Sequence, residues 1–256
     1  MKNNSQLFIV CGASSGFGGA VATRLINEGH RVIAIARDKK RFKELSLKNP
    51  DNLSVIEGDL TDSSTLKKAG NKVQNEYLHG IFVNSGGPPA KKITETTTED
   101  WDQAFKNLLR WKVEFIRMLL PKFLEHGYGR ILFLESSSVK QPIQNLVLST
   151  SLRSAVVGFA KTLSEEIAYK GITVNVLAPG FHDTQALQRL IEKKVESENI
   201  DKESVLKSFA GQTKVGYLGD PHRLASLAGW LLSEESGYIT GQTISVDGGM
   251  VKGTFG

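Results

Sequence analysis

Short apolar runs alternate with longer stretches of helical periodicity along the whole chain, and this alternation restricts the possible folds more than any other feature. Several of the short runs are apolar at nearly every position, which is typical of parallel strands covered on both faces. Alternation of this kind predicts an α/β fold, a doubly wound parallel sheet of about seven strands with helices on both faces. The predicted strands are Leu7–Cys11, Arg31–Ala36, Leu53–Glu57, Gly80–Asn84, Arg130–Glu135, Thr173–Ala178 and Thr243–Val246, and the predicted helices include Gly18–Glu28, Thr98–His126, Ser149–Tyr169 and Pro221–Leu232.

The chain of 256 residues shows no internal repeat, low-complexity tract or linker, so we expect one domain over residues 1–256. The longest irregular insert, about residues 181–220, is rich in charge and predicts a helical flap over a substrate. No apolar run approaches the roughly 18–20 residues of a membrane helix. The N-terminus does not resemble a secretory signal, so no membrane partner is expected.

The cysteine count and the net charge limit the location and the binding partners that we expect. Cys11 is the only cysteine, so the chain forms no internal disulfide, and a cytoplasmic location is expected. The formal net charge is +5, but the 32 basic residues are spread among 27 acidic ones, so we expect a solvated surface and no nucleic-acid partner. We also expect a small-molecule substrate and no metal site.

Residues 12–18, GASSGFG, follow the first predicted strand and open the first predicted helix. Glycines at 12, 16 and 18 allow a sharp turn and a close approach of the backbone to a ligand, and the helix N-terminus offers free N–H groups to a pyrophosphate. The motif therefore predicts a dinucleotide-binding loop of the Rossmann type. Its expected cofactor contacts are Gly12, Ser14, Ser15, Gly16, Phe17 and Gly18.

The end of the second predicted strand indicates which dinucleotide is bound. Ala36 stands where an acidic residue would accept hydrogen bonds from the 2′-hydroxyl of NAD, and Arg37 follows it. An arginine suits a 2′-phosphate through charge-assisted hydrogen bonds. We therefore predict NADP(H) in preference to NAD(H), although Asp38 beside the arginine argues weakly against this.

Five segments in order resemble the short-chain dehydrogenase/reductase family along essentially the entire chain: GASSGFG (12–18), GDL (58–60), VNSGGP (83–88), LAPGFHDT (177–184) and YITGQTISVDGG (238–249). The resemblance implies an NADP-binding Rossmann-type domain, 3-oxoacyl-[acyl-carrier-protein] reductases being among the similar proteins. It also implies a homodimer or homotetramer paired through the helices at about 98–126 and 149–169. By the same resemblance the cofactor is contacted by Asp59 and Leu60 at the adenine, by Asn84 and Gly86 after the fourth strand, and by Pro179, Gly180 and Thr184 at the nicotinamide.

The catalytic set that the resemblance implies, Asn, Ser, Tyr and Lys, is largely missing. The family's spacing puts the asparagine at Leu108, the serine at Ser136, the tyrosine at Ser149 and the lysine at Arg153. Only the serine is present. A shift of register does not recover the tyrosine, because the chain has no tyrosine between positions 128 and 169.

A serine hydroxyl is a far weaker acid than a phenol with a pKa of about 10. Positioned acid–base catalysis contributes about 10²–10⁴-fold, so ordinary ketone reduction should be poor. One solution is a substitute proton donor or anion stabiliser, for which Lys140, His182 and Asp183 are candidates, with Ser136 and Ser138 beside them. Arg153 can hold the nicotinamide ribose in place of lysine, but its guanidinium is a poor acid.

The other solution is a substrate that needs no immediate proton on oxygen. Hydride addition to a conjugated enone spreads charge into an enolate, which Lys140, Arg153 or serine hydroxyls can stabilise. Divergent family members without the tyrosine look like such ene-reductases, and a Lys-x-Pro in them resembles residues 140–142 here. Two alternatives stay open: an NADPH-dependent reductase with an altered catalytic set, acting on an enone or another activated carbonyl compound, and a non-catalytic protein that binds or senses NADP(H).

Overall fold

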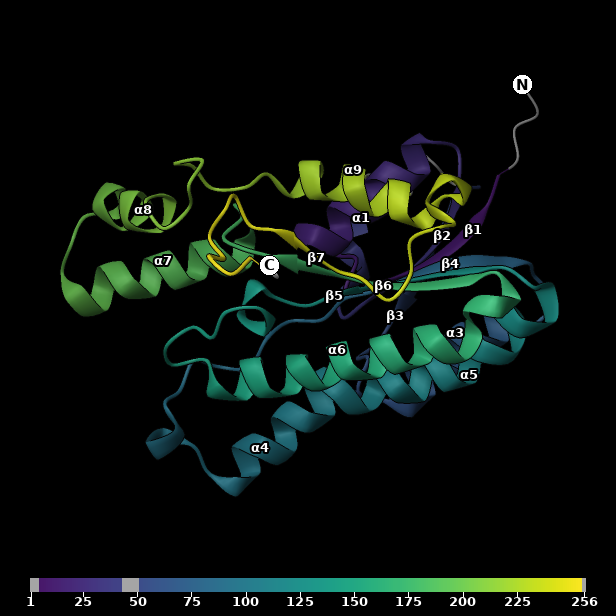
Figure 1. Ribbon diagram of the computed structural model, residues 1–256, viewed down its shortest axis with the longest axis horizontal. Coiled ribbons are helices and arrows are strands. Elements are labelled where there is room, and N and C mark those ends of the chain that lie inside the picture. The colour runs from purple at the N-terminus through teal and green to yellow at the C-terminus, as the bar shows by residue number, and fades with distance from the viewer. Residues whose placement is uncertain (1–4, 43–50, 255–256) are drawn as a thin grey trace.

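The computed structural model describes residues 5–42 and 51–254 and contains a seven-stranded parallel sheet (Figure 1). The strand order is β3-β2-β1-β4-β5-β6-β7, the doubly wound arrangement predicted from the alternation of apolar runs. The order reverses between β1 and β4, so the loops at the carboxyl ends of these strands border a crevice. The strands are β1 (Leu7–Cys11), β2 (Arg31–Ala36), β3 (Leu53–Glu57), β4 (Leu78–Val83), β5 (Gly129–Leu134), β6 (Ile172–Pro179) and β7 (Thr243–Val246).

Helices cover both faces of the sheet (Figure 1). Helices α1 (Gly16–Asn27) and α9 (Pro221–Leu232) pack on one face, where Val21, Leu25 and Leu224 join the buried side chains of the strands. Helices α3 (Ser63–Lys72), α5 (Trp111–His126) and α6 (Val147–Ile167) pack on the other face. The two apolar clusters explain why β1 is apolar at every position and β4 and β5 at most positions. Short 3₁₀ turns occupy Lys39–Phe42, Ile93–Glu95, Ser137–Val139, Ala168–Lys170 and Glu234–Ser236.

The predicted helix at 98–126 is interrupted. It consists of α4 (Thr98–Phe105), a π turn (Lys106–Arg110) and α5. The carbonyl oxygen of Asn107 in this turn accepts a hydrogen bond from the indole Nε1 of Trp111 at 2.8 Å and one from the hydroxyl of Ser85 at 3.4 Å. The π turn therefore ties the loop after β4 to the helix that lines one side of the site.

The charged insert predicted as a flap contains α7 (Gln185–Glu198) and α8 (Lys202–Ala210), which extend beyond the edge of the sheet (Figure 1). These helices have a small apolar cluster of their own, formed by Leu187, Ile191, Val205 and Phe209. Over the described ranges, no helix is both long and apolar enough to cross a bilayer.

Where predicted strand and helix boundaries differ from the structure, the difference is one or two residues. Strand β4 begins at Leu78 and β6 continues to Pro179, because both ends still pair with neighbouring strands. Helix α1 begins at Gly16 and α6 at Val147, two residues earlier than predicted in each case. The earlier start of α6 places Ser149 within its first turn.

Candidate active site

The loop between β1 and α1 is too tightly packed for side chains at two of its glycines. Gly12 has a φ of +62°, and a Cβ there would lie 2.9 Å from the carbonyl oxygen of Asn84. A Cβ on Gly18 would lie 2.3 Å from the carbonyl oxygen of Gly12. Ser15 is the N-cap residue of α1, and its side chain makes no capping hydrogen bond within the described part of the chain. The first N–H groups of the helix are thus open to an anion, so the loop fits a dinucleotide pyrophosphate.

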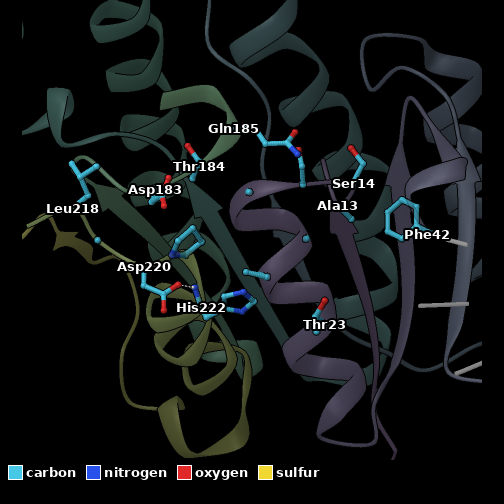
Figure 2. Close-up of a pocket in the computed structure, with 16 residues that line it drawn as sticks. Ala13, Ser14, Thr23, Phe42, Asp183, Thr184, Gln185, Leu218, Asp220 and His222 are labelled. Atoms are coloured by element: carbon cyan, nitrogen blue, oxygen red, sulfur yellow. Dashed lines mark hydrogen bonds between the residues drawn. The ribbon is translucent and has the colours of Figure 1, made fainter. Parts of the chain in front are cut away.

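A cavity of about 750 Å³ opens beside this loop (Figure 2). The loop between β1 and α1, the predicted phosphate loop, forms one wall together with α1. The start of the flap and the start of α9 form the other wall. Thr184 caps α7, its hydroxyl accepting from the Leu187 N–H at 3.3 Å, and its methyl group lies 3.7 Å from the Cβ position of Gly16. The predicted residues that line the cavity are Ser14, Ser15, Gly16, Asp183 and Thr184, and residues that the sequence reasoning missed include Phe42, Leu218, Asp220 and His222.

The residues predicted at the adenine end lie at the carboxyl ends of β2 and β3. Arg37 is exposed directly after β2, where its guanidinium is accessible to a phosphate. The Asp59 carboxylate accepts hydrogen bonds from the N–H and the hydroxyl of Thr61 at 2.8 and 2.7 Å, which orders the turn after β3. Leu60 packs against the apolar cluster between the sheet and helices α3, α5 and α6.

The residues predicted at the nicotinamide end follow β4 and β6. Pro179 ends β6, and a Cβ on Gly180 would lie 2.9 Å from the Cα of Asp247. A Cβ on Gly86, by contrast, would meet no atom within 4 Å in the described structure. The loop after β4 is therefore open on the side where a cofactor would lie.

His182 is buried beneath the phosphate loop instead of facing a substrate. Its ring makes an edge contact with Phe17, with centroids 5.0 Å apart, and its Nδ1 lies 3.1 Å from the Gly180 carbonyl oxygen. Burial lowers the pKa of His182, which keeps the ring neutral, although the hydrogen bond with Gly180 opposes the shift. The Asp183 carboxylate accepts from the amide of Gln188 at 2.7 Å. Both side chains therefore make contacts within the protein at the start of the flap.

A hydrogen bond joins Ser149 and Arg153, the residues at the positions where the family's spacing predicts tyrosine and lysine. Arg153 Nε donates to Ser149 Oγ at 3.1 Å, and both residues are 7% exposed. The hydroxyl oxygen of Ser136, just after β5, accepts a hydrogen bond from the Ser138 N–H at 3.1 Å. Each of these two serine oxygens already accepts one N–H, so each hydroxyl hydrogen is available to donate elsewhere.

A buried cluster of charges holds Arg153. Its Nη1 donates to Glu135 at Oε2 (3.0 Å) and at the backbone oxygen (3.3 Å). The other carboxylate oxygen of Glu135 binds Lys112 Nζ at 2.5 Å, and the side chains of Glu135 and Lys112 are 0% exposed. Burial lowers the pKa of Lys112, while the Glu135 carboxylate opposes the shift. With Nε and Nη1 engaged in the protein, Nη2 is the edge of Arg153 left for a cofactor ribose, and it faces Gly87 at 3.4 Å from that residue's Cβ position.

The sequence reasoning missed Lys112 and Glu135. Both carry a signal in the sequence, because Lys112 lies on a mostly apolar helix face and Glu135 directly follows a fully buried strand. A charge in each of these places needs a partner when it is buried.

Two other predicted residues, Lys140 and Ser138, have different surroundings. Lys140 follows the turn Ser137–Val139 and lines a separate cavity of about 280 Å³ with Val157, Lys161 and Gln242. Ser138 is 1% exposed, and its hydroxyl has no hydrogen-bond partner within the described residues.

Three further residues do not supply the family's asparagine or tyrosine. Leu108, at the family's asparagine position, is fully buried in the π turn and offers no polar side chain. Tyr128 precedes β5 at the opposite end of the sheet, where the Arg130 guanidinium lies 4.3 Å from its ring centroid. Tyr169 follows α6 and is 79% exposed.

Comparisons with known proteins identify the family. A family model described as enoyl-(acyl carrier protein) reductase matches residues 12–251. The chain is 27% identical over 250 residues to the NADPH-dependent reductase BacG of Bacillus subtilis (strain 168), covering 95% of this chain and 96% of that protein. It is 29% identical over 249 residues to the 3-oxoacyl-[acyl-carrier-protein] reductase FabG of Rickettsia bellii (strain RML369-C), covering 97% and 98%.

Solved structures agree with this result. The crystal structure of YwfH, an NADPH-dependent reductase involved in bacilysin biosynthesis, matches with a TM-score of 0.91 at 25% identity and covers 98% of this chain and all of that one. L-Sorbose reductase from Gluconobacter frateurii, complexed with NADPH and L-sorbose, also has a TM-score of 0.91 at 25% identity, with 97% of each chain covered. The NADPH in these names agrees with the preference expected from Ala36 and Arg37. The chain therefore belongs to the short-chain dehydrogenase/reductase family of oxidoreductases.

Proposed function

We propose that the protein is an NADPH-dependent reductase that adds hydride to a carbon–carbon double bond conjugated to a carbonyl group, or to a similarly activated carbonyl compound. The observation that carries the proposal is the hydrogen bond from Arg153 to Ser149 at the positions of the missing lysine and tyrosine. This pair can donate hydrogen bonds to a developing oxyanion, but it has no acidic proton to transfer.

Cofactor binding is proposed at the phosphate loop and along the crevice between β1 and β4. The N-terminus of α1 would hold the pyrophosphate, Arg37 the 2′-phosphate, and Thr184 with the backbone near Gly180 the nicotinamide end. When bound, NADPH supplies the hydride. The NADPH dependence of BacG and the NADPH in the L-sorbose reductase structure support this choice.

The chemistry balances without a protein acid at oxygen. As the β-carbon of the substrate gains hydride, the electron pair of the double bond moves toward the carbonyl oxygen to give an enolate. The hydroxyls of Ser149 and Ser136 are then available to donate to that oxygen, because each already accepts an N–H. A proton from water at the α-carbon completes the reduction. The description of the family model, an enoyl thioester reductase, supports this substrate class.

The test is NADPH oxidation, followed at 340 nm, with matched pairs of substrates. Cyclohexenone is compared with cyclohexanone, and a crotonyl thioester with an acetoacetyl thioester. We expect turnover with the unsaturated member of each pair and little with the saturated ketone. Replacing Ser149 by alanine should lower kcat about 10²-fold, the usual effect of losing one oxyanion donor. Preference for the ketones would contradict the proposal.

The second candidate is a protein that binds NADP(H) without turnover, favoured by the absence of a phenol at position 149. Tight NADPH binding together with no oxidation across both substrate pairs would support it. The cytoplasmic location and the homodimer or homotetramer paired through the helices around 98–126 and 149–169 remain predictions. Light scattering of the purified chain tests the second of these.

A further inference from the structure

Pairwise contacts link the buried charges behind Ser149 into a chain from Lys112 through Glu135 and Arg153 to Ser149. Lys112 lies deepest, on α5, and binds one oxygen of the Glu135 carboxylate. The other oxygen binds Arg153, on α6, which reaches Ser149 through Nε. Of the three charged residues, only Arg153 lies at a position of the family's catalytic set, that of the lysine. Lys112 and Glu135 lie outside this set.

We propose that Glu135 and Lys112 are positioning residues, which together hold the Arg153 guanidinium in the orientation that polarises Ser149 toward the substrate oxygen. The inference rests on the proposed function, and it adds to the site two residues that act through a third. Arginine suits this role because its planar fork can bind a carboxylate and a hydroxyl at once, which a lysine ammonium at the end of a flexible chain does not reproduce.

The contacts explain why both residues are needed. Glu135 fixes Nη1 of Arg153 twice, through its carboxylate and its backbone oxygen, so the guanidinium plane has little freedom to rotate. Lys112 in turn fixes the carboxylate, whose two oxygens would otherwise be free to turn within the cluster. The arrangement leaves Arg153 Nε aimed at Ser149 and Nη2 facing the loop after β4. A displacement of about 1 Å at such a site costs about 10²-fold in rate.

The test separates positioning from stability with three variants. Glu135→Gln keeps the shape but leaves two buried cations without a carboxylate, so its melting temperature should fall. Lys112→Met keeps the pair between Glu135 and Arg153. The double variant removes the surplus cation as well as the carboxylate, so it should recover most of the melting temperature that Glu135→Gln loses.

Turnover should not follow stability. We expect kcat with the conjugated substrate to fall about 10²-fold in both Glu135→Gln and the double variant, with KM for that substrate within about threefold of wild type. Recovery of kcat in the double variant would overturn the proposal, because a purely structural role predicts that rate and stability return together. Glu76→Gln, which breaks the Arg31–Glu76 ion pair outside the site, is the matched control and should leave kcat unchanged.

A second measurement does not depend on turnover. The Nε–H resonance of Arg153, assigned by its loss in Arg153→Lys, should exchange slowly with water in the wild-type chain because Nε is bonded to Ser149 and buried. Its exchange should become at least about tenfold faster in the double variant. Unchanged exchange would overturn the positioning role. If the wild-type chain turns over no substrate of either pair, the proposed function fails while this measurement still decides the arrangement of Arg153.

Discussion

Replacing Gly18 by alanine tests whether close packing of the phosphate loop, and not glycine flexibility alone, makes the cofactor site. A Cβ at this position would lie 2.3 Å from the Gly12 carbonyl oxygen and 3.0 Å from Asn84 Nδ2. Ordinary contacts between carbon and oxygen are about 3.3 Å or longer, so the loop must move by about 1 Å. Overpacking of this kind costs about 1–3 kcal/mol, against a gain of about 1 kcal/mol from the helix propensity of alanine.

The larger effect should be on NADPH. A loop displaced by about 1 Å loses at least one charge-assisted hydrogen bond to the pyrophosphate, about 1.5–3 kcal/mol, which raises the dissociation constant about tenfold or more. At an NADPH concentration 100 times the wild-type dissociation constant, binding stabilises the native protein by about 2.7 kcal/mol. The same concentration would stabilise the variant by about 1.4 kcal/mol. The melting-temperature increase on adding NADPH should therefore fall by about half in Gly18→Ala.

The assay is thermal unfolding with and without NADPH. Gly158→Ala is the matched control, because Gly158 also lies within a helix but its Cβ would meet no atom within 4 Å in the described structure. That variant should gain up to about 1 kcal/mol of stability and keep the full NADPH response. If Gly18→Ala responds to NADPH as strongly as the wild-type chain, the packing argument is wrong.

Three further predictions concern single groups. Arg37→Ala should raise the KM for NADPH about 10- to 100-fold and leave that for NADH nearly unchanged, as steady-state kinetics would show; equal effects on both would refute the 2′-phosphate role. Trp111→Phe removes the hydrogen bond to the Asn107 carbonyl and should lower stability by about 1 kcal/mol in urea unfolding, whereas no loss would mean that the π turn does not depend on it. Burial lowers the pKa of His182 below its ordinary 6.5, so near pH 6.5 the unfolded chain binds a proton at this imidazole more readily than the folded chain. The free energy of unfolding should therefore fall as the pH drops from 7.5 to 5.5. A His182→Asn variant should show a shallower fall in melting temperature over the same range.

The fold was more predictable than the site for a physical reason. Strands β1, β2, β3 and β7 have the bounds predicted from their sequence, because each is a short apolar or β-branched run ended by turn residues. The π turn at 106–110 was not predicted; one of its carbonyls accepts a hydrogen bond from Ser85, which is 22 residues away in the sequence. Periodicity within one segment carries no information about such a contact.

For the site, spacing predicts a dinucleotide-binding loop at residues 12–18, and the close packing at Gly12 and Gly18 fits such a loop. Spacing could not show that the guanidinium of Arg153 turns inward, because this depends on the carboxylate of Glu135, just after β5, and on an ammonium from α5. Spacing also carried no information about the surroundings of Lys140, which follows a 3₁₀ turn and lines a cavity beside the start of β7.

The salt-bridged chain behind Ser149 also limits which side chains this part of the protein can accept. A tyrosine at position 149 would require a ring to fit where the serine is 7% exposed, and a lysine at position 153 would set a second ammonium beside Glu135. Either substitution alone removes the hydrogen bond between the two residues. Grafting a tyrosine and a lysine onto this chain would therefore require new residues at Glu135 or Lys112 as well, so such a design has to rebuild part of the protein interior.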